Sequence, residues 1–184
     1  MHKFLILAGA MLIGMAAEAA PGDVFLLQIP GINGSVNFSK YRGWILVNTF
    51  STGISTSSSG NPGGGGGSGK TVCEPLTVIK PLDSTSPELA LAAGTGKHFA
   101  TITLAALGGN ERGDRNEHEF LRFVLKNAIV TSVLFGGDSV SSSRTETLTI
   151  SAEQIQISST PQQSDGAPGA TSTTEIDCQS GRIQ

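Results

Sequence analysis

Short runs of apolar residues alternate with glycine, proline and polar stretches along most of this chain. The run 100–106 places apolar residues at every second position, whereas 23–29 and the start of 44–50 are apolar on both faces. Both patterns are typical of β-strands, because successive side chains point to opposite faces of a sheet. The pattern predicts about seven strands with hairpin-like connections. They are expected at 23–29, 44–50, 72–79, 100–106, 121–125, 128–135 and 144–157.

One short helix is predicted between the third and fourth of these strands. Ser86 is a good N-cap, Pro87 falls at the first helical position, and Glu88 suits the positive end of the helix dipole. Gly94 is a natural end. So short a helix needs a sheet to dock on. With about seven strands and this one helix, the expected fold is mainly β. It is an antiparallel two-sheet β-barrel or sandwich with one short lateral α-helix.

Two places in the longer strands are expected to be irregular. Lys126 and Asn127 either mark a bend or lie within one long strand. In the last strand, Leu148 and Ile155 have opposite parity. A two-residue period cannot change faces without an extra residue, so a bulge or break is predicted within 151–154.

The N-terminal segment has the features of a signal peptide. Lys3 gives a short basic region, residues 4–17 are apolar, and small residues stand where a signal peptidase reads them. We expect cleavage after Ala19, which removes residues 1–19. An uncleaved anchor helix is the alternative. The chain is then expected to be exported, to the periplasm or as a secreted extracellular protein, with no membrane association after cleavage.

The remainder divides into a domain, 20–158, and a low-complexity C-terminal tail, 159–184, rich in Pro, Gly, Ser and Thr. The chain has two cysteines, Cys73 and Cys178. In an exported protein the simplest expectation is a disulfide between them, which would tie the tail back to the domain. Two free thiols or an intermolecular link are the alternatives. Within the tail, Cys178 is the only candidate anchor.

Composition narrows the function classes. The net charge is −3 and only 15% of residues are charged, which argues against nucleic acid as a partner. The 24 glycines and the many serines and threonines suit an exported β-protein with long polar loops.

The glycine-rich loop contains Gly64-x4-Gly69-Lys70-Thr71, which fits the phosphate-loop pattern letter for letter. That motif needs a buried strand before the loop and a helix after it. Here a serine-rich run precedes the loop, and the β-branched, proline-containing residues 71–81 predict a strand after it. The loop is therefore interpreted as a long flexible β-loop rather than a nucleotide site.

No other chemistry is indicated. His98 and His118 lack a metal-ligand partner at suitable spacing, although His118 lies between two glutamates. No serine stands in the Gly-x-Ser-x-Gly turn of a hydrolase. We expect no catalytic, metal or cofactor-binding residues, and no enzyme activity.

Several segments together resemble the Hcp family, the tube proteins of type VI secretion. The strand and turn at 22–35, the long loop at 63–70, the helix and Gly-Lys-His segment at 86–99, the strand pair at 119–133 and the strand at 145–150 occur in the family's order. The resemblance covers about 23–158, most of the domain.

The resemblance implies a β-barrel with a lateral helix that assembles as a hexameric ring and can stack into a tube. In the family an extended loop reaches a neighbouring ring or subunit. Here that role would fall on 52–70, and the expected inter-subunit loop residues are Thr52, Ser57, Gly60, Gly63, Gly65, Gly67 and Lys70. Partners would be other copies of the chain, with secretion spike or effector proteins as further partners.

Two features depart from the family. Members that form the injected tube lack a signal peptide, and the tail 159–184 is an addition. We therefore expect an exported, Hcp-like structural protein that forms rings or tubes outside the cytoplasm. The alternative is a secreted, monomeric Hcp-fold binding module, or an effector-like protein, that recognises a small ligand or protein partner.

Overall fold

The computed structural model describes residues 22–37, 40–57, 70–108, 118–140 and 142–180. Within these residues it contains one helix and eight strands. The signal peptide expected at 1–19 lies outside them. No helix of the described residues is long and apolar enough to span a membrane. The elements are β1 (Val24–Gln28), β2 (Ile45–Val47), β3 (Thr49–Ser57), β4 (Lys70–Pro81), α1 (Ser86–Thr95), β5 (His98–Gly108), β6 (His118–Asp138), β7 (Ser143–Ser159) and β8 (Ser172–Asp177).

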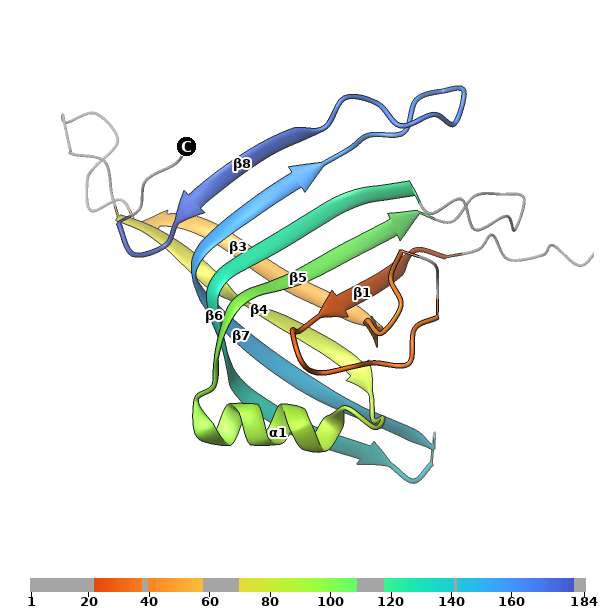
Figure 1. Cartoon of the computed structure of the whole chain (residues 1–184), viewed down its shortest axis with the longest axis vertical. Coiled ribbons are helices and arrows are strands. Elements are labelled where there is room, and N and C mark those ends of the chain that lie inside the picture. Colours follow the sequence, from red (N-terminus) through yellow and green to blue (C-terminus); the bar gives the residue numbers. More distant parts are fainter. Residues whose placement is uncertain (1–21, 38–39, 58–69, 109–117, 141, 181–184) are drawn as a thin grey trace, which may run out of the picture.

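The strands form one antiparallel sheet in the order β2-β1-β5-β6-β7-β4-β3, and β8 pairs with β7 off this path. Only Asn48 separates β2 from β3, so one stretch of chain joins the two ends of the sheet. The Asn48 N–H donates to the Ile79 carbonyl of β4 at 2.8 Å. The sheet is therefore curled into a barrel (Figure 1). The predicted fold class is confirmed, with one curled sheet in place of two and with α1 beside it.

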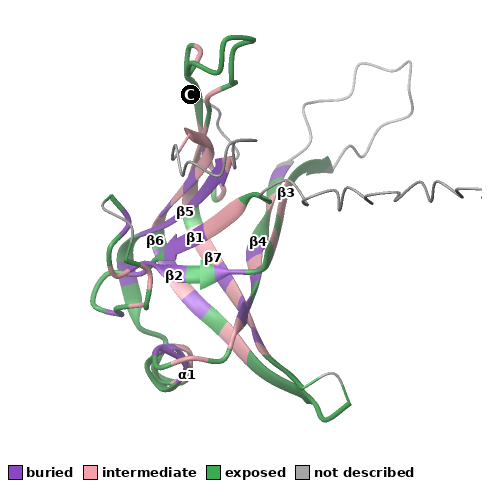
Figure 2. Ribbon diagram, turned by 90° about the vertical axis from the view of Figure 1, so that its right-hand side faces the viewer, coloured by how far each residue is buried: buried purple, intermediate pink, exposed green. Residues whose placement is uncertain are grey.

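The main core fills the inside of this curl. Phe50 of β3 lies between Phe25 and Phe123, with ring centroids 5.0 and 5.9 Å apart, and so links β1, β3 and β6. Leu89 and Ala92 bury one side of α1 in the same cluster. Figure 2 shows the buried residues along the middle of the strands, whereas the far end of the β6–β7 hairpin is exposed.

A smaller cluster lies on the other face of the sheet. Tyr41 and Trp44 pack edge to face, 5.0 Å between centroids, over Leu26, Ala105 and Leu107. The long turn between β1 and β2 thus covers the outside of β1 and β5, which explains why these strands are apolar on both faces.

Three neighbouring strands change their buried face at the same place. In β6 the buried residues change parity between Leu125 and Ala128, and Asn127 between them has a φ of 48°. β7 changes opposite it, at Glu153. β5 changes at Ala100, which is exposed although Ile102 and Leu104 are buried. We call this line the bend.

The bend corrects two expectations. β7 is continuous, and its register with β6 is the same on both sides of Glu153 (Lys126 opposite Gln154, Ala128 opposite Ala152), so the bulge predicted within 151–154 is wrong. The face changes because paired strands turn together, with Asn127 in a left-handed conformation that asparagine tolerates. Ala100 does not share the inward face expected for 100–106.

The helix also differs in detail from the prediction. Thr85 is its N-cap, so Ser86 is the first helical residue and Pro87 the second. Gly94 lies inside the helix, which ends at Thr95 with Gly96 left-handed at a φ of 61°. The Gly96 and Lys97 N–H groups donate to the Ala93 and Ala92 carbonyls. Gly96 therefore supplies the conformation expected of Gly94.

A buried ion pair holds the start of α1 against the sheet. Lys80 of β4 and Glu146 of β7 are opposite each other in the ladder, with relative accessibilities of 0% and 1%. The Lys80 Nζ lies 2.5 Å from Glu146 Oε1 and 3.0 Å from Asp83 Oδ1. The Ser86 Oγ donates to the same Glu146 oxygen at 3.0 Å. The pair thus joins β4, β7 and α1.

Asp83 completes this network. Its Oδ1 accepts hydrogen bonds from the Thr85 N–H and Oγ at 2.8 and 2.6 Å. Partial burial would raise the pKa of Asp83, but the hydrogen bonds from Thr85 and Lys80 outweigh it and lower the pKa below its ordinary value.

We expect Lys80→Met to lower the free energy of unfolding by about 3–5 kcal/mol, because it leaves the Glu146 carboxylate buried without a cation. Lys80→Met combined with Glu146→Leu should cost less than Lys80→Met alone. Urea unfolding measures both, with Lys97→Met at an exposed lysine as the control. A Lys80→Met variant as stable as this control would contradict the role of the pair.

We expect Asp83→Asn to be destabilising at neutral pH and to lose this effect in acid. A carboxyl whose pKa is lower in the folded state contributes stability above its unfolded pKa of about 3.9, and that contribution is lost as the pH falls further. Urea unfolding of both proteins between pH 7 and acid would show the two stabilities converging. A constant difference at every pH would exclude the charge as its cause.

Candidate functional site

The sheet divides into two arms at one end of the barrel. β4 pairs with β7 only from Leu76 to Pro81, although its pairing with β3 continues to Lys70. Pro75 lies where β4 leaves β7, and the β3–β4 register shifts beside it. A proline has no N–H to donate, so it is tolerated at such an irregular position and not inside a regular ladder.

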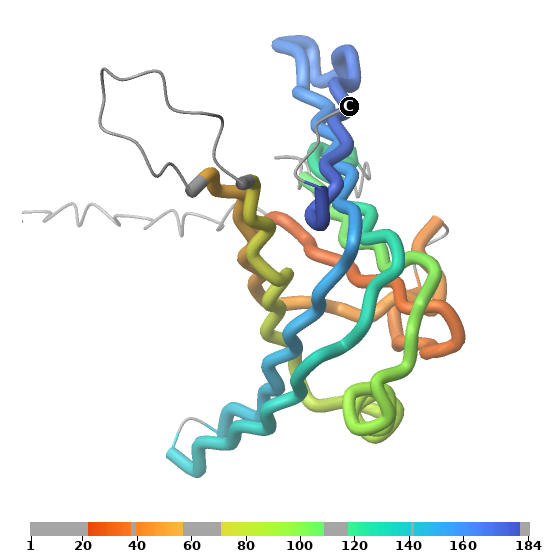
Figure 3. Tube along the Cα trace, turned by 90° about the vertical axis from the view of Figure 1, so that its left-hand side faces the viewer, coloured from red at the N-terminus to blue at the C-terminus, as the bar shows by residue number. Residues whose placement is uncertain are grey.

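The two arms are 53–57 with 70–74, from β3 and β4, and 154–159 with 172–177, from β7 and β8. We call this region the fork. Figure 3 shows the arms diverging from the common sheet. The tail was expected to be held only through Cys178, but it also forms β8, which pairs with β7 from Gln154 to Ser159 and buries Ile176. A Lys126–Glu175 ion pair, 2.8 Å, adds to this contact.

A disulfide between Cys73 and Cys178 spans the fork, with 5.5 Å between the Cα atoms. Cys73 is opposite Ile54 in the β3–β4 arm, and Cys178 directly follows β8. The Cys178 N–H donates to the Glu153 carbonyl at the bend, 2.8 Å. The bond therefore connects the two arms where β4 and β7 no longer pair.

The predicted loop residues lie on the β3–β4 arm as far as the structure describes them. Thr52 stands at the register shift, and its Oγ donates to the Glu74 carbonyl at 3.0 Å. Ser57 and Lys70 are the last pair of the hairpin. Lys70 begins a strand, so the phosphate-loop pattern is not followed by a helix. Gly60, Gly63, Gly65 and Gly67 lie outside the described residues.

An apolar hollow of about 290 Å³ opens between the arms. None of the lining residues that the structure describes is charged. We call it the fork hollow, and its lining residues are Thr52, Gly53, Ile54, Phe123, Ile155 and Ile157.

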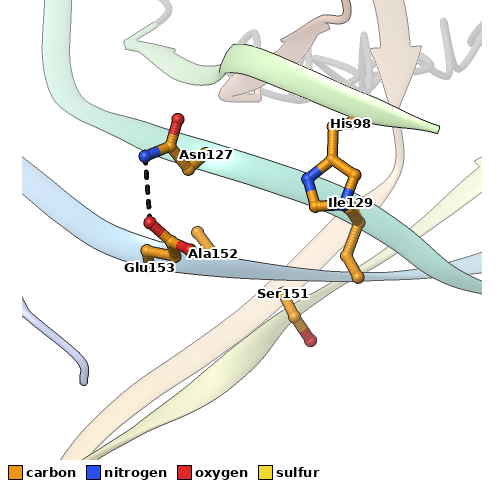
Figure 4. Close-up of a pocket in the computed structure, with 6 residues that line it drawn as sticks. All are labelled: His98, Asn127, Ile129, Ser151, Ala152 and Glu153. Atoms are coloured by element: carbon orange, nitrogen blue, oxygen red, sulfur yellow. Dashed lines mark hydrogen bonds between the residues drawn. The ribbon is translucent and has the colours of Figure 1, made fainter. Parts of the chain in front are cut away.

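A second hollow, of about 190 Å³, lies at the bend (Figure 4). Its residues are His98, Asn127, Ile129, Ser151, Ala152 and Glu153. The Asn127 Nδ2 donates to Glu153 Oε2 at 2.9 Å, and the His98 ring lies beside Ile129, apart from this pair. The other predicted histidine, His118, contacts the Thr160 carbonyl through Nε2 at 3.1 Å. No group of three possible metal ligands occurs among the described residues. These contacts offer no nucleophile–base pair and no metal site.

The outer face of β3, β4, β7 and β6 carries no charged residue between the bend and the β6–β7 hairpin. One row across these strands is Thr49, Ile79, Thr147 and Leu134, and the next is Ser51, Thr77, Thr149 and Ser132. These side chains are exposed or half-buried. We call these eight residues the uncharged face.

Charged residues are depleted at the centre of protein–protein interfaces, whereas solvent-exposed surfaces carry them freely. The uncharged face therefore has the composition of a contact surface. Sequence reasoning missed it, although a signal was present: Thr145, Thr147 and Thr149 alternate with Glu146, Leu148 and Ile150. Only the pairing of four strands shows that the uncharged positions are adjacent.

We expect Cys73→Ser to lower the free energy of unfolding by about 2–4 kcal/mol, because the loop closed by the disulfide is long. Urea unfolding under oxidising conditions measures the loss, and a matched reduction of the parent chain should reproduce it. Titration of the native protein with a thiol reagent should find no reactive thiol. Two reactive thiols per chain would contradict the bond.

A family model and a protein of known name both relate this chain to Hcp proteins. Residues 26–158 match the family described as Type VI secretion system effector, Hcp. Protein hcp1 of Pseudomonas aeruginosa is 35% identical over 100 residues, which are 53% of this chain and 59% of that protein. The aligned part of the chain thus spans less than two thirds of that relative.

Solved structures share the fold. A structure of a type six secretion system protein has a TM-score of 0.79 and 21% identity, and the match covers 88% of this chain and 99% of that one. Hcp1 from Salmonella typhimurium has a TM-score of 0.72 and 22% identity, with 89% and 100% covered. At these identities the likeness shows the curled antiparallel barrel and its lateral helix.

Proposed function

This chain belongs to the Hcp family of type VI secretion system proteins, and on that premise we propose that it is a structural protein that assembles with copies of itself into a ring. Following the family resemblance, the proposed ring contains six copies, and rings stack into tubes. The role needs no catalytic group. Secretion spike or effector proteins are the further partners that this role would bring.

The observation that carries this proposal is the uncharged face. Eight exposed or half-buried side chains from four strands, none of them charged, form a broad and regular surface. Packing against a second copy would cover it at little desolvation cost, because its hydroxyl groups can pair across the contact and no charge is buried. The loop 52–70, on the β3–β4 arm, is proposed to reach a neighbouring subunit.

We further propose that assembly takes place outside the cytoplasm. The Cys73–Cys178 disulfide supports this location, because disulfides form and persist in oxidising compartments. The signal peptide proposed at 1–19 would direct the export.

One observation favours a second candidate, a secreted monomer that binds a small apolar ligand or a protein partner. The fork hollow is large enough for a small apolar group, since cavities of about 150 Å³ can hold benzene. The absence of a charged residue from its lining makes it a weaker recognition site than one with oriented polar groups.

Light scattering of the purified chain tests the proposal, together with electron microscopy of the same sample. We expect a closed assembly of several copies. Thr147→Lys, which places a charge in the middle of the uncharged face, should reduce the assembly to monomers and leave the fold intact by circular dichroism. Thr173→Lys, on the exposed strand β8, is the matched control and should assemble.

A parent chain that remains monomeric at high concentration would exclude the ring and favour the ligand-binding monomer. Assembly of both lysine variants would leave the ring in place and exclude the uncharged face as its contact.

A further inference from the structure

The tip of the β6–β7 hairpin carries an apolar knob. Leu134, Phe135 and Val140 have relative accessibilities of 64%, 59% and 93%. Leu134 and Phe135 are consecutive in a strand, so they point to opposite faces, and each face of the hairpin exposes one of them. The charged residues of the hairpin end, Asp138 and Arg144, lie closer to its turn. The hairpin extends past α1 at one end of the molecule (Figures 1 and 3). Such a cluster at an exposed tip is unfavourable in water unless something covers it.

The fork hollow is the complementary feature. Phe123, Ile155 and Ile157 form its buried and half-buried side, and Ile54, 39% exposed, lies at its opening. Its volume of about 290 Å³ exceeds what a phenyl ring needs, given that a cavity of about 150 Å³ binds benzene. An aromatic or branched aliphatic side chain would fill it without burying a charge.

The knob cannot fill the hollow of its own chain. Phe123 of the hollow and Phe135 of the knob stand on the same strand, separated by roughly 40 Å of strand at about 3.3 Å per residue. The bend lies between them: Phe123 is opposite Ile157, which pairs with β8, whereas Phe135 is opposite Glu146, near the β6–β7 turn. A contact between two different patches at opposite ends of one molecule is heterologous, and it repeats from copy to copy.

We propose that the knob of one copy docks in the fork hollow of the next copy, head to tail along the long axis of the molecule. The contact joins one ring to the next, whereas the uncharged face joins neighbours within a ring. It thus deepens the proposed function and rests on it. Phe135 is the residue that enters the hollow, and Ile54 packs against it at the opening.

The test uses two variants that each remove one half of the contact. Phe135→Asp destroys the knob and keeps the hollow, whereas Ile54→Asp does the reverse. Each alone should lower the apparent association constant for stacking by about tenfold or more, as expected when a central apolar contact is replaced by a charge. Single rings should persist in both. Leu91→Asp, at an equally exposed leucine of α1, is the control and should stack like the parent.

Mixing the two variants gives the decisive result. Rings of Phe135→Asp still offer hollows, and rings of Ile54→Asp still offer knobs, so a mixture should form stacks of two rings and no longer ones. Sedimentation velocity and electron microscopy distinguish these species.

Three results would overturn the inference. The first is undiminished stacking of both single variants, and the second is a mixture that stays as single rings. The third is a parent chain that forms rings without stacks, which would leave the proposed ring intact but not its stacking. A monomeric parent would refute the proposed function and this contact together.

Discussion

The barrel depends on the point where three strands change their buried face. Residues of opposite parity on the two sides of this point, such as Leu125 and Val130, belong to the same core cluster. β5, β6 and β7 change together at Ala100, Asn127 and Glu153, and the left-handed conformation of Asn127 makes the change without an inserted residue. Because Glu153 also accepts the hydrogen bond from Cys178, the bend fixes where the fork and its disulfide lie.

The two halves of the molecule on either side of the bend are held by different forces. On the side of the bend that carries α1, β4 and β7 pair directly, and the buried Lys80–Glu146 ion pair holds α1 against them. On the other side of the bend, the β4–β7 pairing ends beside Pro75. There the two arms are joined by the Cys73–Cys178 disulfide and enclose the fork hollow. The disulfide that joins the arms is of the kind that forms where thiols oxidise, which agrees with the proposed assembly outside the cytoplasm.

The proposed assembly requires surfaces that can be removed from water without destabilising the free subunit. The uncharged face meets this requirement with threonine and serine, whose hydroxyl groups are hydrated in the monomer and can pair in a contact. The knob and the fork hollow meet it with few apolar atoms at separate ends, too far apart to satisfy each other within one chain. The proposed lateral and axial contacts then use largely separate residues, with Leu134 common to both surfaces.

Local residue patterns determined most of the strands, the short helix and the fold class, because the alternation of apolar residues and the turn residues act over a few neighbours. They divided β6 into two strands, at 121–125 and 128–135, and joined β2 to the start of β3 in one strand at 44–50. The segments at 22–35, 86–99, 119–133 and 145–150 also carried the family resemblance, and with it the barrel and its lateral helix. The same patterns misplaced both ends of α1 by one or two residues. The N-cap is Thr85 and not the neighbouring Ser86, and the left-handed glycine after the helix is Gly96 and not Gly94.

Tertiary structure decided the rest. The parity change in β7 was visible in the sequence, but its cause was not, because the matching changes in β5 and β6 are residues far away in the chain. The tail reads as low-complexity, yet β8 forms because the edge of β7 beyond β4 is free to pair. The uncharged face likewise exists only when four strands lie in register. Register between distant strands is set by packing around a common core, and no local pattern encodes it.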